Sequence, residues 1–192
     1  MKYKWVEWEE VEDWTLSLAR NVLSSGFEPD AIVAIARGGL CVARILADAL
    51  DVNRIYSFKV EHWGSTATIT RDEAVILQPL TEEVRGKRIL LVDDIVDTRK
   101  SFIVGRKHVV ERGAKEVKTA AMQWIVNAAF RPDYYGTEVK EWTWFIYPWN
   151  RIEDLKNIAK KESATGDLRA FFKEKLGIDI PEKYLPFLGV NV

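Results

Sequence analysis

The sequence predicts an α/β fold with a parallel central sheet. Residues 31–36 and 88–92 form short, mostly apolar runs in which polar and apolar residues do not alternate. Such runs are typical of strands that helices cover on both faces. Each run leads through a polar turn into a segment whose apolar residues have helical spacing. Strands that alternate with helices through short links favour a parallel sheet with right-handed crossovers.

The other elements follow in order along the chain. The apolar residues of the first segment fall on one helical stripe, and Gly26 lies just beyond it, as expected for a helix that ends there. Pro148 ends the last predicted strand, and Gly113 ends the last helix of the alternating pattern. We therefore expect helices over residues 11–22, 40–50 and 100–112, and further strands over residues 117–123 and 142–147.

Two stretches do not follow this pattern. Residues 62–73 are rich in Thr, Ser and Gly, and we expect a mobile hairpin or lid there, within residues 60–78. Residues 154–192 read as a charged helical tail with an apolar face, which we expect to pack on the domain or on a second subunit. The expected division is a domain over residues 1–153 and a C-terminal helical extension over residues 154–192.

Composition excludes several classes of function. The 192 residues include 28 Lys and Arg against 29 Asp and Glu, a net charge of −1. This balance gives no electrostatic reason to expect nucleic acid or an anionic membrane as a partner. Cys41 is the only cysteine, and the longest purely apolar run is six residues, whereas a membrane helix needs about 20. We expect a soluble, cytoplasmic protein without disulfides.

The polar residues that follow the second apolar run indicate a binding site. Ligands of open α/β sheets bind at the carboxyl ends of the strands, and Asp93 and Asp94 end this run. Their side chains should point to opposite sides of the extended backbone, where they could hold two neighbouring hydroxyls, or one hydroxyl and a hard metal ion. Residues 97–101 then open a helix whose free N–H groups could bind an anion. An acidic strand end with ordinary N-capping by Asp97 or Thr98 is the alternative interpretation.

Residues 90–101 resemble the phosphoribosyl-diphosphate motif of the type I phosphoribosyltransferases. The match comprises three apolar residues, two acids, two apolar residues, an Asp-Thr pair and a final hydroxyl. Residues 31–40 resemble the pyrophosphate loop of the same family. The N-terminal helix and residues 144–149 are similar to the xanthine–guanine type of purine phosphoribosyltransferase. The likeness extends from the N-terminus to about Asp154 and leaves the tail outside it.

The resemblance implies a Rossmann-like fold and a reaction. A purine base and phosphoribosyl diphosphate (PRPP) would give a purine nucleotide and pyrophosphate, with Mg²⁺ as cofactor and a homodimer or higher homo-oligomer as the assembly. Asp93 and Asp94 would bind the ribose 2′- and 3′-hydroxyls, with Asp94 also closest to Mg²⁺. Asp97 would be the general base that takes the proton from the purine.

The resemblance also assigns the remaining contacts. The 5′-phosphate would lie against Thr98, Arg99, Lys100 and Ser101. Pyrophosphate would contact Arg37 and Gly38, in a loop that often holds a non-proline cis peptide in this family, with Lys59 a further candidate that could equally be a solvated lysine. The purine would meet Gln123, Trp144 and Phe145, and the flat indole of Trp144 could stack on it or, as the alternative, belong to the core.

Two residues depart from the family pattern. Arg99 replaces the usual glycine, which disfavours a close backbone wrap around phosphate, although its guanidinium could itself bind phosphate. Gln123 stands near the position of a lysine that donates to the purine 6-oxo group in similar enzymes, and an amide could instead accept from the amino group of adenine. An adenine phosphoribosyltransferase is therefore one alternative. A catalytically silent nucleotide-sensing regulator, supported only by Arg99, is the other.

Overall fold

The computed structural model describes residues 2–63, 73–97, 100–126, 128–164 and 166–188. The chain divides into two compact units. The larger unit comprises residues 9–141, and the smaller one combines Met1–Trp8 with Trp142–Val192. The expected division after residue 153 does not coincide with these units, because the N-terminal residues pair with the segment that follows residue 142.

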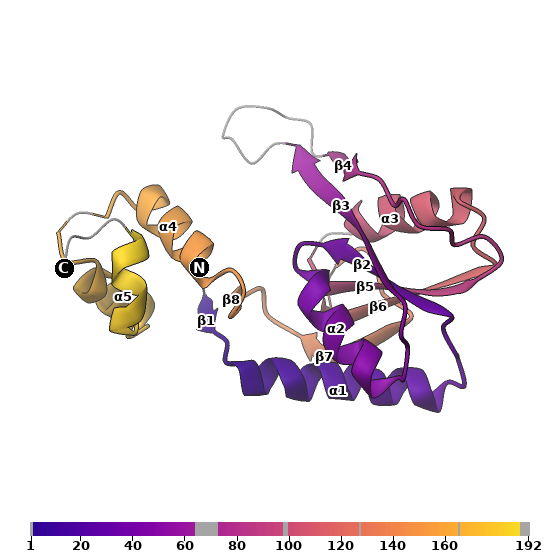
Figure 1. Cartoon of the computed structure of the whole chain (residues 1–192). Helices are drawn as coiled ribbons and strands as arrows, with labels where there is room; N and C mark the ends of the chain where they lie inside the picture. Colours follow the sequence, from indigo (N-terminus) through magenta and orange to yellow (C-terminus); the bar gives the residue numbers. More distant parts are fainter. Residues whose placement is uncertain (1, 64–72, 98–99, 127, 165, 189–192) are drawn as a thin grey trace. The chain divides into compact units, whose positions relative to one another are not determined.

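The larger unit contains a six-stranded sheet with the strand order β4-β3-β2-β5-β6-β7. All neighbouring strands are parallel except β3 and β4, which are antiparallel. Helices α1 and α2 lie on one face of the sheet and α3 on the other (Figure 1). The strands are β2 (Ala31–Ala36), β3 (Ile55–Trp63), β4 (Glu73–Gln78), β5 (Arg88–Val96), β6 (Glu116–Ile125) and β7 (Tyr134–Val139), and the helices are α1 (Trp8–Ser24), α2 (Gly39–Ala49) and α3 (Lys100–Glu111).

The sequence-based elements of this unit are confirmed with small shifts of their ends. Strand β2 has the predicted bounds, whereas β5 continues four residues beyond Val92 to Val96. Strands β3, β4 and β7 were not predicted. They lie at or next to the sheet edges, and residues such as Tyr56, Ser57 and Gly136 interrupt the apolar pattern of β3 and β7.

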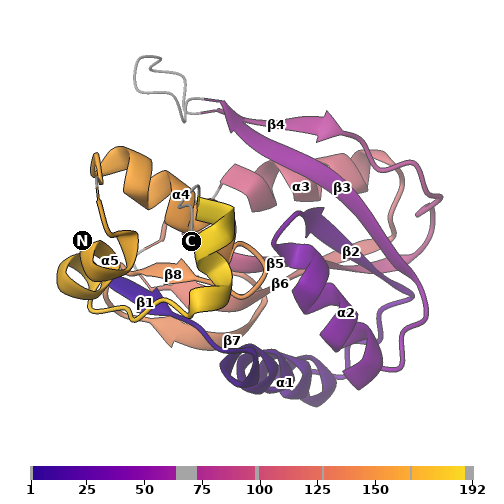
Figure 2. The same ribbon diagram turned by 60° about the vertical axis from the view of Figure 1, so that its left-hand side comes forward.

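The core of the larger unit shows which residues of each strand face α3. Alternate residues of the central strands join a buried cluster on the α3 face, which is made by Val33, Ile35, Phe58, Val60, Ile89, Leu91, Phe102 and Val109, among others. Figure 2 shows α3 on one side of the sheet with α1 and α2 on the opposite side. The intervening strand residues therefore project on the α1–α2 face.

The smaller unit has a separate sheet and a separate core. Strand β1 (Tyr3–Trp5) pairs in parallel with β8 (Trp144–Ile146), so the predicted strand over residues 142–147 does not join the central sheet. Helices α4 (Arg151–Lys161) and α5 (Leu168–Leu176) and a 3₁₀ helix (Glu182–Leu188) follow. A buried apolar cluster of this unit comprises Ile146, Leu155, Ile158, Leu168, Phe172, Ile178 and Ile180.

The apolar face of the C-terminal extension thus packs inside the smaller unit. Leu168 and Phe172 are buried in its core, and Tyr184 and Leu188 are partly buried against it. Gly177 ends α5 in the left-handed conformation, with φ of 69°, which is the usual glycine cap. No helix within the described ranges is long and apolar enough to cross a membrane.

Candidate active site

The first of the two predicted loops follows β2. The peptide between Ala36 and Arg37 is cis, so the non-proline cis peptide expected in this loop precedes Arg37. Arg37 and Gly38 form a turn, and α2 begins at Gly39. The loop therefore connects the carboxyl end of a central strand directly to a helix, which is the usual place for a ligand in this type of sheet.

The end of β5 lies directly against this loop. A Cβ atom added to Gly38 would lie 2.0 Å from Oδ2 of Asp94, and one added to Gly39 would lie 2.6 Å from the backbone oxygen of Val92. Neither position has room for a side chain. The structure thus brings Gly38 and Asp94, which are 56 positions apart in the sequence, into direct contact.

Asp93 and Asp94 are half-buried and each accepts a local hydrogen bond. Asp93 Oδ1 accepts from the backbone N–H of Asp94 at 2.9 Å, and Asp94 Oδ1 accepts from that of Ile95 at 2.8 Å. Burial, followed by repulsion from the Asp94 carboxylate, raises the pKa of Asp93 well above its ordinary value. Burial also raises the pKa of Asp94, with a smaller contribution from Asp97. Both carboxylates are therefore placed where a cation or hydroxyl donors would stabilise their charge.

Asp97 follows β5 as an exposed residue. Thr98 and Arg99 lie outside the described residues, so their predicted contacts with the 5′-phosphate stay predictions. Lys100 and Ser101 form the first turn of α3, and both are half-buried. The predicted helix start after the acidic strand end is confirmed at this position.

Two further predicted residues lie on strands next to these loops. Lys59 on β3 is the register partner of Ala36, the residue before Arg37. Gln123 on β6 is the register partner of Ile95 and is 2% exposed. It lies inside the strand, which continues to Ile125, rather than at its end. Both residues nevertheless flank the strands from which the two loops emerge.

Trp144 and Phe145 belong to β8 and hence to the smaller unit. The indole of Trp144 is 39% exposed, so it is not a core residue. Its Nε1 donates to Oδ1 of Asp154 at 3.3 Å, and Asp154 itself is buried. Asp154 was not predicted from the sequence, because a single acid in a charged helical segment gives no signal of its own.

Magnesium fits the residues at the end of β5. The described residues contain no group of three or more His, Cys, Asp or Glu side chains arranged as a metal site. Mg²⁺ needs fewer, because it commonly takes one or two protein carboxylates together with substrate phosphates and water. The two adjacent carboxylates with raised pKa values are suitable oxygen ligands for it.

The two loops at the carboxyl ends of β2 and β5 form a candidate site at the place where α/β enzymes bind their ligands. The family model of the phosphoribosyl transferase domain matches residues 7–150. The chain belongs to this family.

Relatives of known identity agree with this assignment. Xanthine-guanine phosphoribosyltransferase of Idiomarina loihiensis is 27% identical over 161 residues, which cover 82% of this chain and 94% of that protein. The corresponding protein of Gluconobacter oxydans is 30% identical over 148 residues, which cover 77% of this chain and 84% of that protein.

Solved structures give the same result for the fold. A purine phosphoribosyltransferase from Pyrococcus horikoshii has a TM-score of 0.66 at 29% identity, covering 78% of this chain and 94% of that one. A protein from Neisseria gonorrhoeae with bound ppGpp has a TM-score of 0.68 at 27% identity, and the match covers 84% of this chain and 98% of that one. The predicted α/β fold of the type I phosphoribosyltransferases is thus confirmed.

Proposed function

We propose that this phosphoribosyltransferase acts in purine salvage and transfers the phosphoribosyl group from PRPP to a 6-oxopurine, that is hypoxanthine, guanine or xanthine. The observation that carries the proposal is the direct packing of Gly38 against Asp94. It supports a site in which the pyrophosphate loop and the ribose-binding acids act on one ligand. The relatives named as xanthine-guanine phosphoribosyltransferases support the choice of base.

The reaction replaces the bond between C1 of the ribose and the pyrophosphate oxygen with a bond from C1 to a purine nitrogen. In the proposal, Asp93 and Asp94 hold the ribose hydroxyls and Arg37 and Gly38 hold the leaving pyrophosphate. Asp97 takes the proton that the attacking nitrogen loses, and Lys100 and Ser101, with Thr98 and Arg99, hold the 5′-phosphate. When bound through Asp94, Mg²⁺ supplies charge neutralisation for the leaving group.

The purine contacts are proposed from the resemblance together with two properties of the side chains. Trp144 and Phe145 offer aromatic faces for stacking, and Trp144 is exposed enough to do so. Gln123 offers an amide that can either donate to a 6-oxo group or accept from a 6-amino group. Adenine is therefore the second candidate base.

An assay with PRPP, Mg²⁺ and each of hypoxanthine, guanine, xanthine and adenine tests the proposal. We expect nucleotide and pyrophosphate in equal amounts with at least one 6-oxopurine, and no product when the metal is chelated. Turnover of adenine alone would move the assignment to the second candidate. Absence of product with all four bases would contradict the proposed enzyme.

The Asp97→Asn variant tests the proposed general base. Because a positioned carboxylate contributes about 10²–10⁴-fold to such proton transfers, we expect kcat to fall by that factor while the KM for PRPP changes little. Asp48→Asn is the matched control, since Asp48 is an exposed residue of α2 paired with Arg44. Turnover of Asp97→Asn equal to that of the control would remove Asp97 from the role.

A regulatory ligand is a further part of the proposal. The Neisseria gonorrhoeae structure contains bound ppGpp, and a nucleotide with phosphates at two positions has the same groups that the proposed site would bind. We propose that ppGpp competes with PRPP here, which a rise in the KM for PRPP without a change in kcat would support. The expected homo-oligomer and cytoplasmic location also remain proposals, testable by sedimentation and by fractionation of cells.

A further inference from the structure

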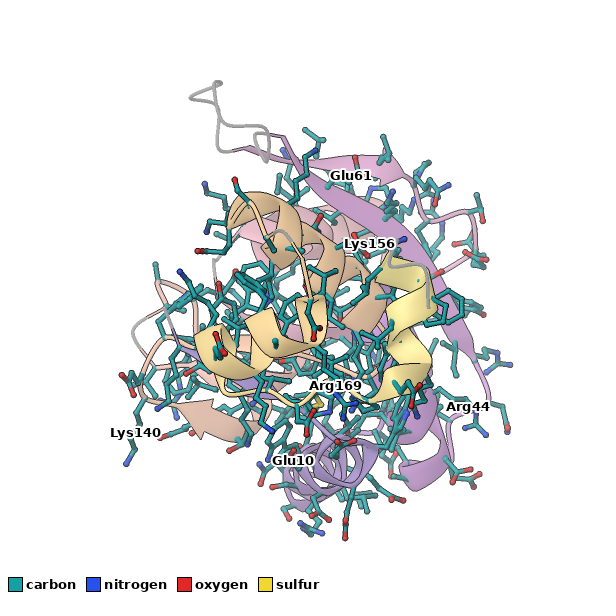
Figure 3. The ribbon with its side chains drawn as sticks, turned by 90° about the vertical axis from the view of Figure 1, so that its left-hand side faces the viewer. Glu10, Arg44, Glu61, Lys140, Lys156 and Arg169 are labelled. Atoms are coloured by element: carbon teal, nitrogen blue, oxygen red, sulfur yellow. The ribbon has the colours of Figure 1, made fainter. Side chains whose placement is uncertain are left out.

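Strand β3 carries an ion pair beside the proposed pyrophosphate loop. The Nζ atom of Lys59 lies 2.5 Å from Oε1 of Glu61. The Lys59 side chain is 26% exposed and that of Glu61 is 46% exposed. Glu61, labelled on β3 in Figure 3, was not singled out by the sequence analysis, because its significance depends on the strand pairing.

The strand geometry places both side chains on the face that the loop crosses. Phe58 and Val60 belong to the buried cluster on the α3 face. Successive side chains of a strand alternate between faces, so Lys59 and Glu61 project on the opposite face. This is the face on which α2 begins, immediately after Arg37 and Gly38.

The strand order places opposite charges on the two sides of this loop. Strand β2 lies between β3 and β5. Lys59 is the register partner of Ala36 on one side, and the Asp94 carboxylate contacts Gly38 on the other. A pyrophosphate group held by the loop would therefore have an ammonium group on its β3 side, and that ammonium group is already paired with a carboxylate.

We propose that Glu61 is an internal counter-ion that the pyrophosphate group of PRPP displaces from Lys59. The inference rests on the proposed function and adds a residue that sets the affinity for the donor and for the product. The anion must compete with Glu61 for the same cation when it binds. When pyrophosphate leaves, Glu61 pairs with Lys59 again, which favours product release.

The exposure of the pair sets the expected size of the effect. Half-exposed ion pairs of this kind are weak, so breaking one costs the incoming anion about two- to five-fold in affinity. Neutralising Glu61 should thus strengthen binding of both PRPP and pyrophosphate by that factor. Because salt screens exposed charges, the gain should shrink as ionic strength rises.

The Glu61→Gln variant tests this inference. We expect the KM for PRPP and the inhibition constant of pyrophosphate each to fall about two- to five-fold. Calorimetric titration with magnesium pyrophosphate should show the same gain in affinity. Glu111→Gln is the matched control, because Glu111 forms an exposed ion pair with Lys107 on α3 and the variant loses the same charge. The inference is overturned if Glu61→Gln binds pyrophosphate no more tightly than this control.

A double variant shows whether Glu61 acts through Lys59. Lys59→Gln should weaken pyrophosphate binding, and adding Glu61→Gln to it should give no further change. A gain of equal size in the Lys59→Gln background would overturn the inference.

The calorimetric arm also separates this inference from the proposed function. If the wild type binds pyrophosphate but transfers no phosphoribosyl group, the function fails while the effect of Glu61 can still be measured. If the wild type transfers the group and Glu61→Gln behaves as the control, only the inference fails.

Discussion

Two regions of the described chain hold charged side chains partly or fully away from solvent, and they compensate these charges differently. In the smaller unit, Arg151 is 7% exposed. Among the described residues, its buried Nε has no hydrogen-bond partner, but its guanidinium is matched at both terminal nitrogens. It donates to Glu7 Oε2 at 2.7 Å, to the hydroxyl of Tyr184 at 2.9 Å and to the backbone oxygen of Val6. It also lies 4.2 Å from the ring centre of Trp5. Its hydrogen bond lowers the pKa of Glu7.

At the end of β5 the opposite is found. Asp93 and Asp94 are adjacent carboxylates whose pKa values are raised by burial, and the interactions that oppose this rise are hydrogen bonds within residues 93–95. A structural charge is compensated by the protein itself, whereas a binding site leaves part of the compensation to its ligand. The comparison therefore supports a structural role for Arg151 and the proposed ligand-binding role of the acid pair.

The largest effect is expected when the matched charge is removed. Arg151→Met leaves the buried oxygen of Val6 without this donor and removes the contact with Trp5. We expect a loss of about 2–4 kcal/mol in the free energy of unfolding of the smaller unit, measured by urea denaturation. Arg169→Met is the control, because Arg169 forms a half-exposed pair with Asp179, and such pairs are worth about 0–1 kcal/mol. Equal losses in the two variants would contradict the structural role of Arg151.

A smaller effect of opposite sign is expected at the acid pair. Asp93→Asn keeps the acceptor for the N–H of Asp94 but removes the repulsion, so we expect it to stabilise the protein by about 0.5–2 kcal/mol at neutral pH while weakening PRPP binding. Because the folded-state pKa of Asp93 is raised, its ionisation costs stability. The difference in stability between Asp93→Asn and the wild type should therefore become smaller as pH falls through that raised pKa toward the ordinary value of 3.8.

Asp133→Asn provides the control for this prediction. The Asp133 carboxylate accepts from the backbone N–H of Thr119 at 2.8 Å and from its hydroxyl at 2.7 Å, and lies 3.6 Å from Lys118. Because these partners stabilise the charged carboxylate of Asp133, we expect Asp133→Asn to lower the stability of the protein. Destabilisation by Asp93→Asn as well would remove the distinction between the two kinds of site.

The smallest effect concerns a partly buried histidine. His108 Nε2 accepts from the backbone N–H of Leu80 at 3.0 Å. Burial lowers its pKa, as does Arg112, against an opposing effect of Glu111. The neutral form is favoured in the folded state, so this contribution is complete above the ordinary pKa of 6.5 and is lost as pH falls through the lowered one.

Comparison of the wild type with His108→Gln at pH 7.5 and at lower pH measures this contribution. At pH 7.5 we expect the wild type to be more stable than His108→Gln by no more than about 1.5 kcal/mol, the value of one neutral hydrogen bond. This difference in stability between the two proteins should become smaller at the lower pH. A difference that grows as pH falls would contradict the sign.

The central part of the fold was predictable because its signals are local. Strand β2 and helices α2 and α3 follow from apolar runs and helical spacing, and the loops after β2 and β5 carry motifs that lie together in the sequence. Strands β3 and β7 were missed because half-exposed strands keep no continuous apolar run. The β1–β8 pair was missed because Tyr3 and Trp144 pair across most of the chain length.

The site was predictable to the same extent. Asp93, Asp94, Arg37 and Gly38 were identified from their motifs, but the contact between Gly38 and Asp94 is a property of the strand order. Glu61 is an example of a site residue that could not be predicted from the sequence. Its pairing with Lys59 has a meaning only once β3 is known to lie next to β2, and no local pattern reports that neighbour.

The most direct test of the account is a crystal structure of the protein with PRPP and Mg²⁺. We predict density for the ribose at Asp93 and Asp94 and for the pyrophosphate at Arg37 and Gly38, with Lys59 turned from Glu61 toward the pyrophosphate. Density for PRPP elsewhere on the molecule, or none at a saturating concentration, would contradict the assignment of the site.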